Sequence, residues 1–306
     1  MAHTGTRGGN GSAGGNGATP PRAWDVAGTV GGPVILFLHG TRVTRHMWHP
    51  QVRAFANDYR MVSVDLPAHG VLKDIPFRMT LAKDHIRRTI DEACGGRAIL
   101  VGQSLGGYLA MLVAAEDPEA VEGLVLTNCS AEPRTIARRA ARTIGGYLVG
   151  ATRQRIRGHV PGPEAWPAGE PHHEQAVVEF EPATRGVLFR GSSRALASAL
   201  RMRFLTRLAA YPGPTLILNG ELDEVFRRSE LEFLAACRHG RLAVVPGSGH
   251  ICNIEGAEVY NAALRGFIDD IRAGRTIGDA PTATDDGANP APVSEPAAPS
   301  EQLVGA

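Results

Sequence analysis

The stretch VGQSLGGYLA (residues 101–110) decides the fold. It has one serine, Ser104, with a glycine two residues before it and another two residues after it, which is the G-x-S-x-G pattern. An apolar run (98–101) precedes the pattern, and a segment with helical composition (105–120) follows it. We therefore predict a sharp strand-to-helix turn that presents the Ser104 hydroxyl at a helix N-terminus, where the helix dipole favours negative charge.

Further apolar runs of strand length occur on both sides of this turn. They are PVILFLHG (33–40), RMVSVDLP (60–67), EGLVLTN (122–128), PTLILNG (214–220) and RLAVVPG (241–247). Continuous Val, Ile and Leu runs indicate strands buried on both faces, and helical patterns lie between most of them. The alternation predicts an α/β fold with a mostly parallel central sheet flanked by helices.

Three segments depart from this alternation. Residues 1–21 are rich in Gly, Asn and Thr, and residues 276–306 in Pro, Ala and acidic side chains, so both are predicted to be disordered tails. Residues 131–208 lack a clear strand and contain several Pro and Gly interruptions, which favours an inserted helical cap. The α/β core would then comprise residues 22–130 and 209–275.

Composition narrows the class of protein. The 306 residues carry a net charge of +1 with no basic block beside aromatic residues, which argues against a nucleic-acid partner. No apolar run reaches the length of a membrane helix and no signal peptide is evident, so we expect a cytoplasmic protein without membrane contact. The four cysteines have no CxxC spacing, and neither a metal nor an organic cofactor is expected.

The partners that a nucleophilic serine needs follow two later strands. Active sites in such sheets gather at the carboxyl ends of the strands, where Asp223 follows the run 214–220 and His250 follows the run 241–247. A serine hydroxyl needs a base to take its proton, and the imidazole needs a carboxylate to hold its tautomer. We predict that Ser104, Asp223 and His250 are the catalytic residues, in the order Ser, Asp, His along the chain.

Two other carboxylates compete for the role of the acid. Asp223 follows its strand by the expected loop length, whereas Glu221 is interpreted as shaping the turn and Glu224 as facing solvent. Asn128, at the end of the run 122–128, leaves no carboxylate after that strand and so supports Asp223. The structural alternatives are a turn-capping aspartate and a loop histidine without a catalytic role.

The negatively charged oxygen of a tetrahedral intermediate needs hydrogen-bond donors, and two backbone N–H groups are suited to this role. The backbone N–H groups of Thr41, after the first buried strand, and of Leu105, after the serine, are predicted to form the oxyanion hole. His39 is interpreted as structural. Met47, Trp48 and Cys129 are candidates for pocket lining, with core packing as the alternative that we favour.

The combined motifs resemble those of the α/β-hydrolase superfamily, in its branch of small single-domain serine esterase-like enzymes with a helical cap. The resemblance is carried by LHG (38–40), VDLPAHG (64–70), GQSLGGYLA (102–110), LNGELDEV (218–225) and GSGHICNIEGAEVYNAALRGFI (247–268). It implies the nucleophile, acid, base and oxyanion roles given above. Two features depart from the family: Ala68 replaces a common glycine, and the sequence before Val34 is too short and Gly-rich for the full opening hairpin, which implies a missing or reduced edge strand.

The resemblance also limits the reaction. A serine at position 104 argues against dehalogenases and epoxide hydrolases, which attack through a carboxylate, and the absence of HGGG argues against the lipase-like branch. We predict a serine hydrolase that cleaves an ester, lactone or thioester of a small molecule through an acyl-enzyme. The alternatives are a non-hydrolytic enzyme of this fold (cyclase, lyase or acyltransferase) and a ligand-binding module.

The predicted cap is strongly basic. Between Arg134 and Arg207 it has thirteen arginines against five glutamates and no aspartate. Such a charge would attract an acidic substrate or one bound to a carrier protein. The alternative, which we favour, is a solvent-exposed helix face.

Overall fold

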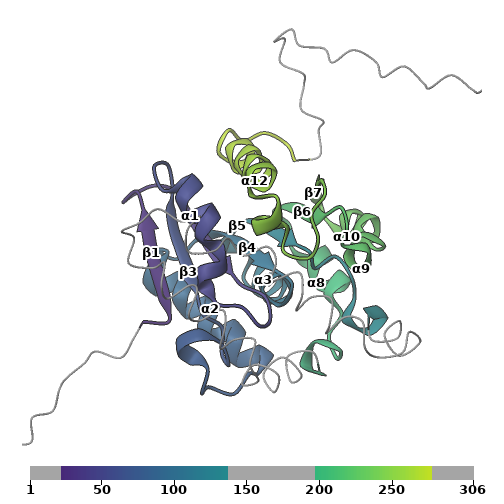
Figure 1. Ribbon diagram of the computed structural model, residues 1–306, viewed down its shortest axis with the longest axis horizontal. Coiled ribbons are helices and arrows are strands. Elements are labelled where there is room, and N and C mark those ends of the chain that lie inside the picture. Colours follow the sequence, from purple (N-terminus) through teal and green to yellow (C-terminus); the bar gives the residue numbers. More distant parts are fainter. Residues whose placement is uncertain (1–21, 137–196, 278–306) are drawn as a thin grey trace, which may run out of the picture.

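The computed structural model describes residues 22–136 and 197–277 (Figure 1). The predicted tail at 1–21, nearly all of the tail at 276–306, and residues 137–196 of the predicted cap lie outside these ranges, so the tails and the cap stay predictions. Within the described ranges, no helix has the length and apolar character needed to cross a membrane.

A seven-stranded sheet organises the described chain. Its strands are β1 (Trp24–Gly28), β2 (Val34–Leu38), β3 (Arg60–Val64), β4 (Ala98–Gln103), β5 (Val121–Thr127), β6 (Pro214–Gly220) and β7 (His239–Val245). The spatial order is β1-β3-β2-β4-β5-β6-β7, and every pair is parallel except β1 with β3. The predicted fold class is confirmed, and all six predicted strands are present.

Strand β1 lies at the sheet edge. The short sequence before Val34 predicts that the full opening hairpin is not formed and that an edge strand is missing or reduced; the described residues before Val34 hold the single strand Trp24–Gly28, which pairs over five residues with β3 in antiparallel register. Gly28, with a φ of 88°, ends the strand; a Cβ there would lie 2.1 Å from the carbonyl oxygen of Tyr59. The chain can therefore turn closely beside β3 because residue 28 has no side chain.

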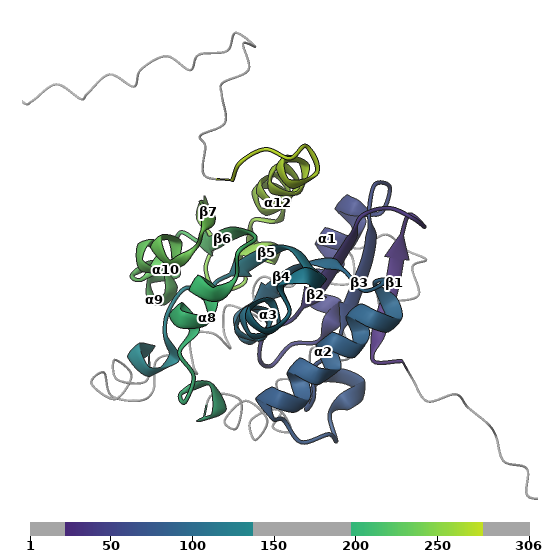
Figure 2. The ribbon, with the colours of Figure 1, turned by 180° about the vertical axis from the view of Figure 1, so that it is seen from behind.

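Helices cover both faces of the sheet (Figures 1 and 2). The helices α2, α3, α8 and α10 pack on one face and α1 and α12 on the other. Their bounds are α1 (His49–Phe55), α2 (Met79–Ala93), α3 (Leu105–Glu116), α8 (Phe204–Ala210), α9 (Glu224–Arg227), α10 (Glu230–Ala236), α11 (Cys252–Glu255) and α12 (Ala257–Arg272). Short 3₁₀ turns are η1 (Arg45–Trp48), η2 (Gly70–Leu72) and η3 (Pro118–Ala120).

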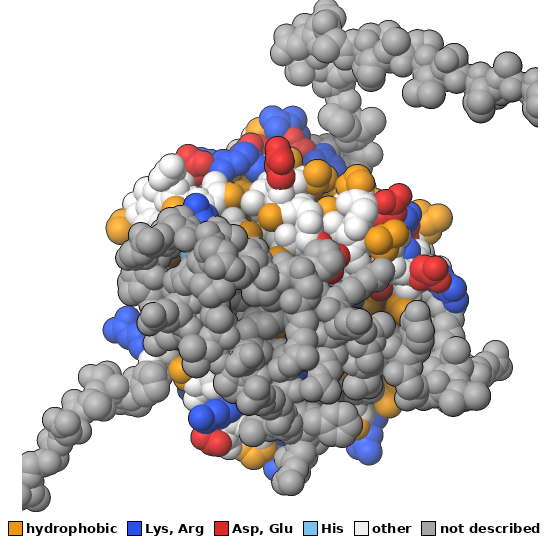
Figure 3. Space-filling view, viewed as in Figure 1, with side chains coloured by type: hydrophobic (Ala, Val, Ile, Leu, Met, Phe, Trp, Pro, Cys, Tyr) orange, Lys and Arg blue, Asp and Glu red, His pale blue; other side chains and the backbone are white. Residues whose placement is uncertain are grey.

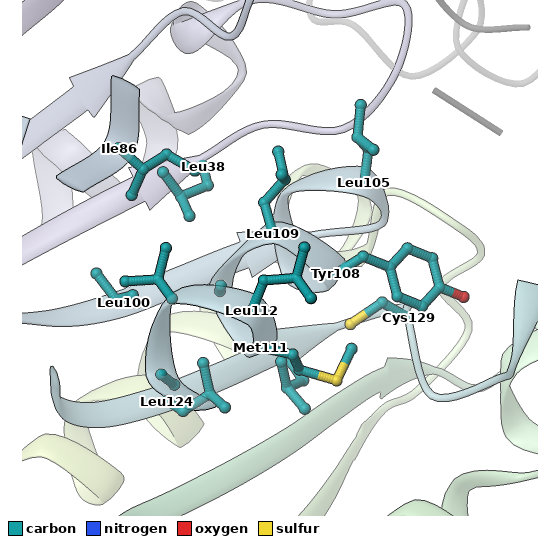
Figure 4. Close-up of a cluster of buried hydrophobic side chains, with 14 of the residues drawn as sticks. Leu38, Ile86, Leu100, Leu105, Tyr108, Leu109, Met111, Leu112, Leu124 and Cys129 are labelled. Carbon is teal, nitrogen blue, oxygen red and sulfur yellow. The ribbon is translucent and has the colours of Figure 1, made fainter. Parts of the chain in front are cut away.

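Helix α3, which begins directly after Ser104, is the centre of the larger core cluster (Figure 4). All ten residues from Leu105 to Ala114 are buried, because the helix lies between the sheet, α2 and α8. Alternate side chains of the strands, such as Leu38 and Leu100, point to the same cluster. A helix that is apolar all round and buried all round gives the turn before it a rigid base.

The two stems of the predicted cap lie together. Glu132 Oε1 accepts a hydrogen bond from the backbone N–H of Leu205 at 2.9 Å, and Arg134 Nε donates to the carbonyl oxygen of Leu200 at 2.6 Å. The chain therefore leaves the core after β5 and returns to it before β6 at the same place. This pattern is what an insertion between two neighbouring strands requires.

Candidate active site

Backbone strain is concentrated at the carboxyl edge of the sheet. Within the described ranges, the non-glycine residues with positive φ are Arg42 (68°), Ala68 (66°), Ser104 (50°) and Asn128 (48°). They follow β2, β3, β4 and β5, respectively. Such conformations cost free energy and persist where the surrounding structure enforces them, and they are typical of functional sites. The clustering therefore locates the candidate active site independently of sequence motifs.

Ser104 lies on the sharp turn that the G-x-S-x-G pattern predicts. It has a φ of 50° and a ψ of −112°, between β4 and α3, and is partly exposed. A Cβ on Gly102 would lie 2.5 Å from the Gly106 carbonyl carbon, and one on Gly106 would lie 2.1 Å from the Leu38 carbonyl oxygen. Only glycine fits at either flank, because backbone atoms occupy the space on both sides.

Asp223 and His250 are brought together from two loops that are 27 residues apart in sequence. The distance between Asp223 Oδ2 and His250 Nδ1 is 2.7 Å, and because an ionised carboxylate only accepts, the Nδ1–H donates. Asp223 is buried and His250 is partly exposed. This bond fixes the imidazole tautomer and leaves Nε2 as the nitrogen that can accept a proton.

The two competing glutamates lie elsewhere. Glu221 is exposed, and its Oε2 accepts the backbone N–H of Gly247 at 2.7 Å, which ties the β6 and β7 loops together. Glu224 is exposed and pairs with Arg228. Of the three carboxylates considered from the sequence, Asp223 is the one that contacts His250.

The base loop is also bonded to the serine turn. Gln103, the residue before Ser104, donates from Nε2 to the carbonyl oxygen of His250 at 2.8 Å. A Cβ on Gly40 would lie 2.0 Å from Gln103 Oε1 and 3.3 Å from Ser104 Cβ, so the loop after β2 lies directly against the serine turn. The chain thus brings the loops after β2, β4 and β7 to one point.

Phe226 contacts the imidazole from the side. Its ring is stacked on the His250 ring, with the centroids 5.1 Å apart and the planes at 21°. Its backbone N–H donates to the carbonyl oxygen of Asp223 at 3.1 Å, so one short turn, at the start of α9, places both the carboxylate and this ring against His250. No sequence pattern predicts this role for Phe226, because a single aromatic residue carries no motif.

The loop that carries Thr41 is held by a buried ion-pair network. Asp65, fully buried, accepts the backbone N–H of Arg45 at 2.9 Å and also pairs with its guanidinium; Arg45 Nε donates to Asp25 Oδ2 at 2.6 Å. Asp65 Oδ2 also accepts the backbone N–H of Val71 at 3.1 Å, which joins the loop after β3 to the network. The network links β1 and the loops after β2 and β3. No sequence pattern predicts it, because the three partners are distant along the chain.

The two predicted oxyanion donors lie on either side of the serine. Thr41 follows Gly40, which contacts the serine turn, and Leu105 is the first residue of α3. The first N–H groups of a helix have no partner within the helix. Both residues lie next to Ser104 along the chain or in space, and their role as oxyanion donors stays a prediction.

His39 is a buried structural residue in this arrangement. Its Nε2 accepts the backbone N–H of Leu66 at 3.0 Å, and its Nδ1 lies 2.7 Å from the carbonyl oxygen of Gly40. Burial, with the nearby His69, holds the pKa of His39 well below its usual range, so the ring is neutral. A neutral ring with both nitrogens bonded links the loops after β2 and β3.

The three candidates for pocket lining pack in the core. Trp48 is fully buried and stacks on Phe37, with the ring centroids 4.9 Å apart, and Met47 lies in the same cluster. Cys129 is fully buried beneath α3, and burial raises the pKa of its thiol. The described contacts of these side chains are with the core, and pocket lining stays a prediction for them.

Charges on the described surface are mixed. Among the side chains coloured by type in Figure 3, basic and acidic ones are interspersed. Most of the cap arginines lie outside the described ranges, so the basic cap stays a prediction. In the described part of the chain, no group of three or more His, Cys, Asp or Glu side chains is arranged to hold a metal ion.

Comparisons with known proteins bear on the fold and on the class of enzyme. The chain is 27% identical to a 2-(acetamidomethylene)succinate hydrolase of Mesorhizobium japonicum (78% of this chain, 88% of the relative). It is also 27% identical to a pimeloyl-[acyl-carrier protein] methyl ester esterase of Neisseria meningitidis serogroup B (77% and 92%). Its fold matches the crystal structure of the enol-lactonase from Burkholderia xenovorans LB400 with a TM-score of 0.63, at 20% identity (80% and 95%).

The family model of the alpha/beta hydrolase family matches residues 35–263. The match begins in β2, includes every loop of the candidate site and ends within α12, so it covers most of the chain. The resemblance stated from the motifs is confirmed, and so is the expectation of an enzyme of the hydrolase class. The chain belongs to the alpha/beta hydrolase family.

Proposed function

We propose that this protein is a serine hydrolase that cleaves an ester, lactone or thioester of a small molecule through an acyl-enzyme. The observation that carries the proposal is the 2.7 Å hydrogen bond between Asp223 and His250, on a loop that is itself hydrogen-bonded to Gln103, the residue before Ser104 on its strained turn. A histidine oriented by a buried carboxylate at a nucleophile turn is the arrangement that activates a serine hydroxyl.

The proposed reaction has two halves. Ser104 Oγ attacks the carbonyl carbon while His250 Nε2 takes its proton, and the oxygen of the tetrahedral intermediate accepts bonds from the N–H groups of Thr41 and Leu105. His250 then gives the proton to the leaving alcohol or thiol. Water, deprotonated by His250, attacks the acyl-enzyme and releases the acid, which restores the Ser104 hydroxyl.

The relatives suggest where to look for substrates. One relative is an esterase for the methyl ester of pimeloyl-[acyl-carrier protein], and another is a hydrolase of 2-(acetamidomethylene)succinate. We propose an acyl substrate of this kind, either free and acidic or bound to a carrier protein. A substrate panel should therefore contain methyl esters in free and carrier-bound form, lactones, thioesters and acylated amines.

The first test is the intact mass of the protein after treatment with a small fluorophosphonate, for wild type and Ser104→Ala. One adduct on the wild type alone supports an activated Ser104, and turnover on the panel should then be lost in Ser104→Ala and His250→Ala. Turnover that survives Ser104→Ala would overturn the acyl-enzyme and favour a non-hydrolytic reaction of the cyclase, lyase or acyltransferase type.

A further inference from the structure

Asn128 joins the acid loop to the base loop. It is fully buried, and its Nδ2 donates to Asp223 Oδ2 at 2.6 Å and to the carbonyl oxygen of Gly249 at 2.9 Å. Its Oδ1 accepts the backbone N–H of Gly220 at 3.2 Å and the thiol of Cys252 at 3.0 Å. All the hydrogen-bonding capacity of this amide is directed at residues that surround Asp223 and His250.

The position suits asparagine in particular. The side-chain amide of Asn128 uses both of its N–H donors and its oxygen acceptor here. A carboxylate, a hydroxyl or an apolar side chain cannot supply this combination. The backbone has a φ of 48°, in the region where asparagine is enriched among residues with a side chain. Both the side chain and the backbone of residue 128 therefore favour the same residue type.

We propose that Asn128 is a positioning residue of the reaction that acts through Asp223; this rests on the proposed serine hydrolase. Asn128 and His250 bind the same oxygen of Asp223. Because Asn128 also holds the carbonyl of Gly249, it fixes that oxygen relative to the backbone that carries the imidazole. The His250 Nδ1–H then finds its acceptor in place, without rearrangement during proton transfer.

The proposal predicts different effects for two substitutions. Asn128→Ala removes both donors, so kcat should fall at least tenfold while KM changes less than twofold. Asn128→Asp puts a second carboxyl beside Asp223. While protonated, it still donates to Asp223; once ionised, it repels Asp223, and two buried carboxylates in contact share a proton. The Asp variant should therefore lose kcat/KM as the pH rises, through a descending limb that the wild type lacks.

A matched control separates positioning from general stability. Tyr260→Phe removes a buried hydrogen bond at the neighbouring residue, where the Tyr260 hydroxyl lies 2.8 Å from Thr127 Oγ1. It should lower Tm without adding a descending limb to the pH profile. The same limb in Tyr260→Phe, or a wild-type pH profile in Asn128→Asp, would overturn the proposal.

The experiment measures kcat and KM against pH for the wild type and these three variants, each first shown to be folded by circular dichroism. If Asn128→Asp does not fold, the test rests on Asn128→Ala. A kcat equal to that of the wild type would contradict the positioning role of Asn128, and a loss of kcat at constant KM would support it. Ser104→Ala runs in parallel. If it retains turnover, the proposed hydrolase fails; if it is inactive while the Asn128 variants match wild type, the positioning role alone fails.

Discussion

Gly106 lies against the carbonyl of Leu38, and a Cβ on residue 106 would lie 2.1 Å from that oxygen. Helix α3 and strand β2 therefore approach each other so closely beside the serine turn that no side chain fits between them at residue 106. The close approach brings the oxyanion loop after β2 to the nucleophile after β4. The second glycine of the G-x-S-x-G pattern thus has a packing role in the sheet as well as a role in the turn.

Gly106→Ala should be strongly destabilising. The added methyl meets backbone atoms of β2, which have no rotamer to move aside, so the helix and the strand must separate. Overpacking of this kind costs about 1–3 kcal/mol and sometimes more. Urea unfolding followed by circular dichroism should show a lower midpoint, or the variant should fail to accumulate as folded protein.

A second glycine provides the control. Gly266 is exposed on α12, and a Cβ there would meet nothing within 4 Å. Gly266→Ala should raise the free energy of unfolding by about 0.5–1 kcal/mol, because alanine has the higher helix propensity. Equal effects of the two substitutions would contradict the close-approach argument.

The strands of the sheet and the order of the candidate residues Ser104, Asp223 and His250 along the chain can be predicted from the sequence, because both depend on local patterns. The apolar runs have the length and composition of buried strands, and Ser104, Asp223 and His250 each follow one. The contacts that hold these residues are not predicted, because they join distant positions. Asn128 is 95 residues from Asp223, and Arg45 lies 20 residues from both Asp25 and Asp65. Residue type alone does not say that such partners meet.

The edge strand β1 is an element that the local sequence does not predict. Trp24–Gly28 is a five-residue segment, WDVAG, between glycine-rich stretches and without a continuous apolar run, so its local sequence does not predict a strand. It forms because β3 offers a free edge, and Asp25 on it gains an ion pair with Arg45. A strand that pairs at the sheet edge with partly exposed side chains needs little apolar character of its own.

The pair of Arg45 and the buried Asp65 should matter far more for stability than the pair of Arg45 and the partly exposed Asp25. Arg45→Met leaves the carboxylate of Asp65 buried without its partner, which typically costs about 3–5 kcal/mol. Asp25→Ala removes a carboxylate that is 39% exposed and should cost about 1 kcal/mol or less. The urea midpoints of the two variants measure both losses of stability. Similar small losses would show that the buried carboxylate of Asp65 does not need the Arg45 guanidinium.

Phe226 should affect turnover through the orientation of His250. Removing the ring lets the imidazole tilt, and a displacement of about 1 Å at a catalytic group can reduce the rate up to a hundredfold. Phe226→Leu is therefore expected to lower kcat/KM about tenfold or more. Phe233→Leu, a fully buried phenylalanine on α10, is the control for lost aromatic packing and should lower Tm with kcat/KM unchanged. Equal losses of kcat/KM would assign the effect to stability.

His69 should make the protein less stable in mild acid. It is fully buried beside His39, with ring centroids 5.0 Å apart, and its Nδ1 lies 2.9 Å from the carbonyl oxygen of Pro67. Burial lowers the pKa of His69 from 6.5 to about 4. Between these values the unfolded chain binds a proton that the folded chain does not, so the free energy of unfolding falls as the pH drops from about 6.5 towards 4 and is unaffected above that range.

The size of this effect follows from the shift. A difference of about 2.5 pH units corresponds to about 3 kcal/mol near pH 4. His69→Asn keeps an N–H donor for Pro67 but does not titrate, so its urea midpoint should depend less on pH between 4 and 6.5, even if it is lower at pH 7.5. His39, whose pKa burial also lowers, maintains part of the slope in the variant. His239→Asn, at an exposed position, should leave the slope unchanged, and an unaltered slope in His69→Asn would show that His69 is protonated in the folded protein.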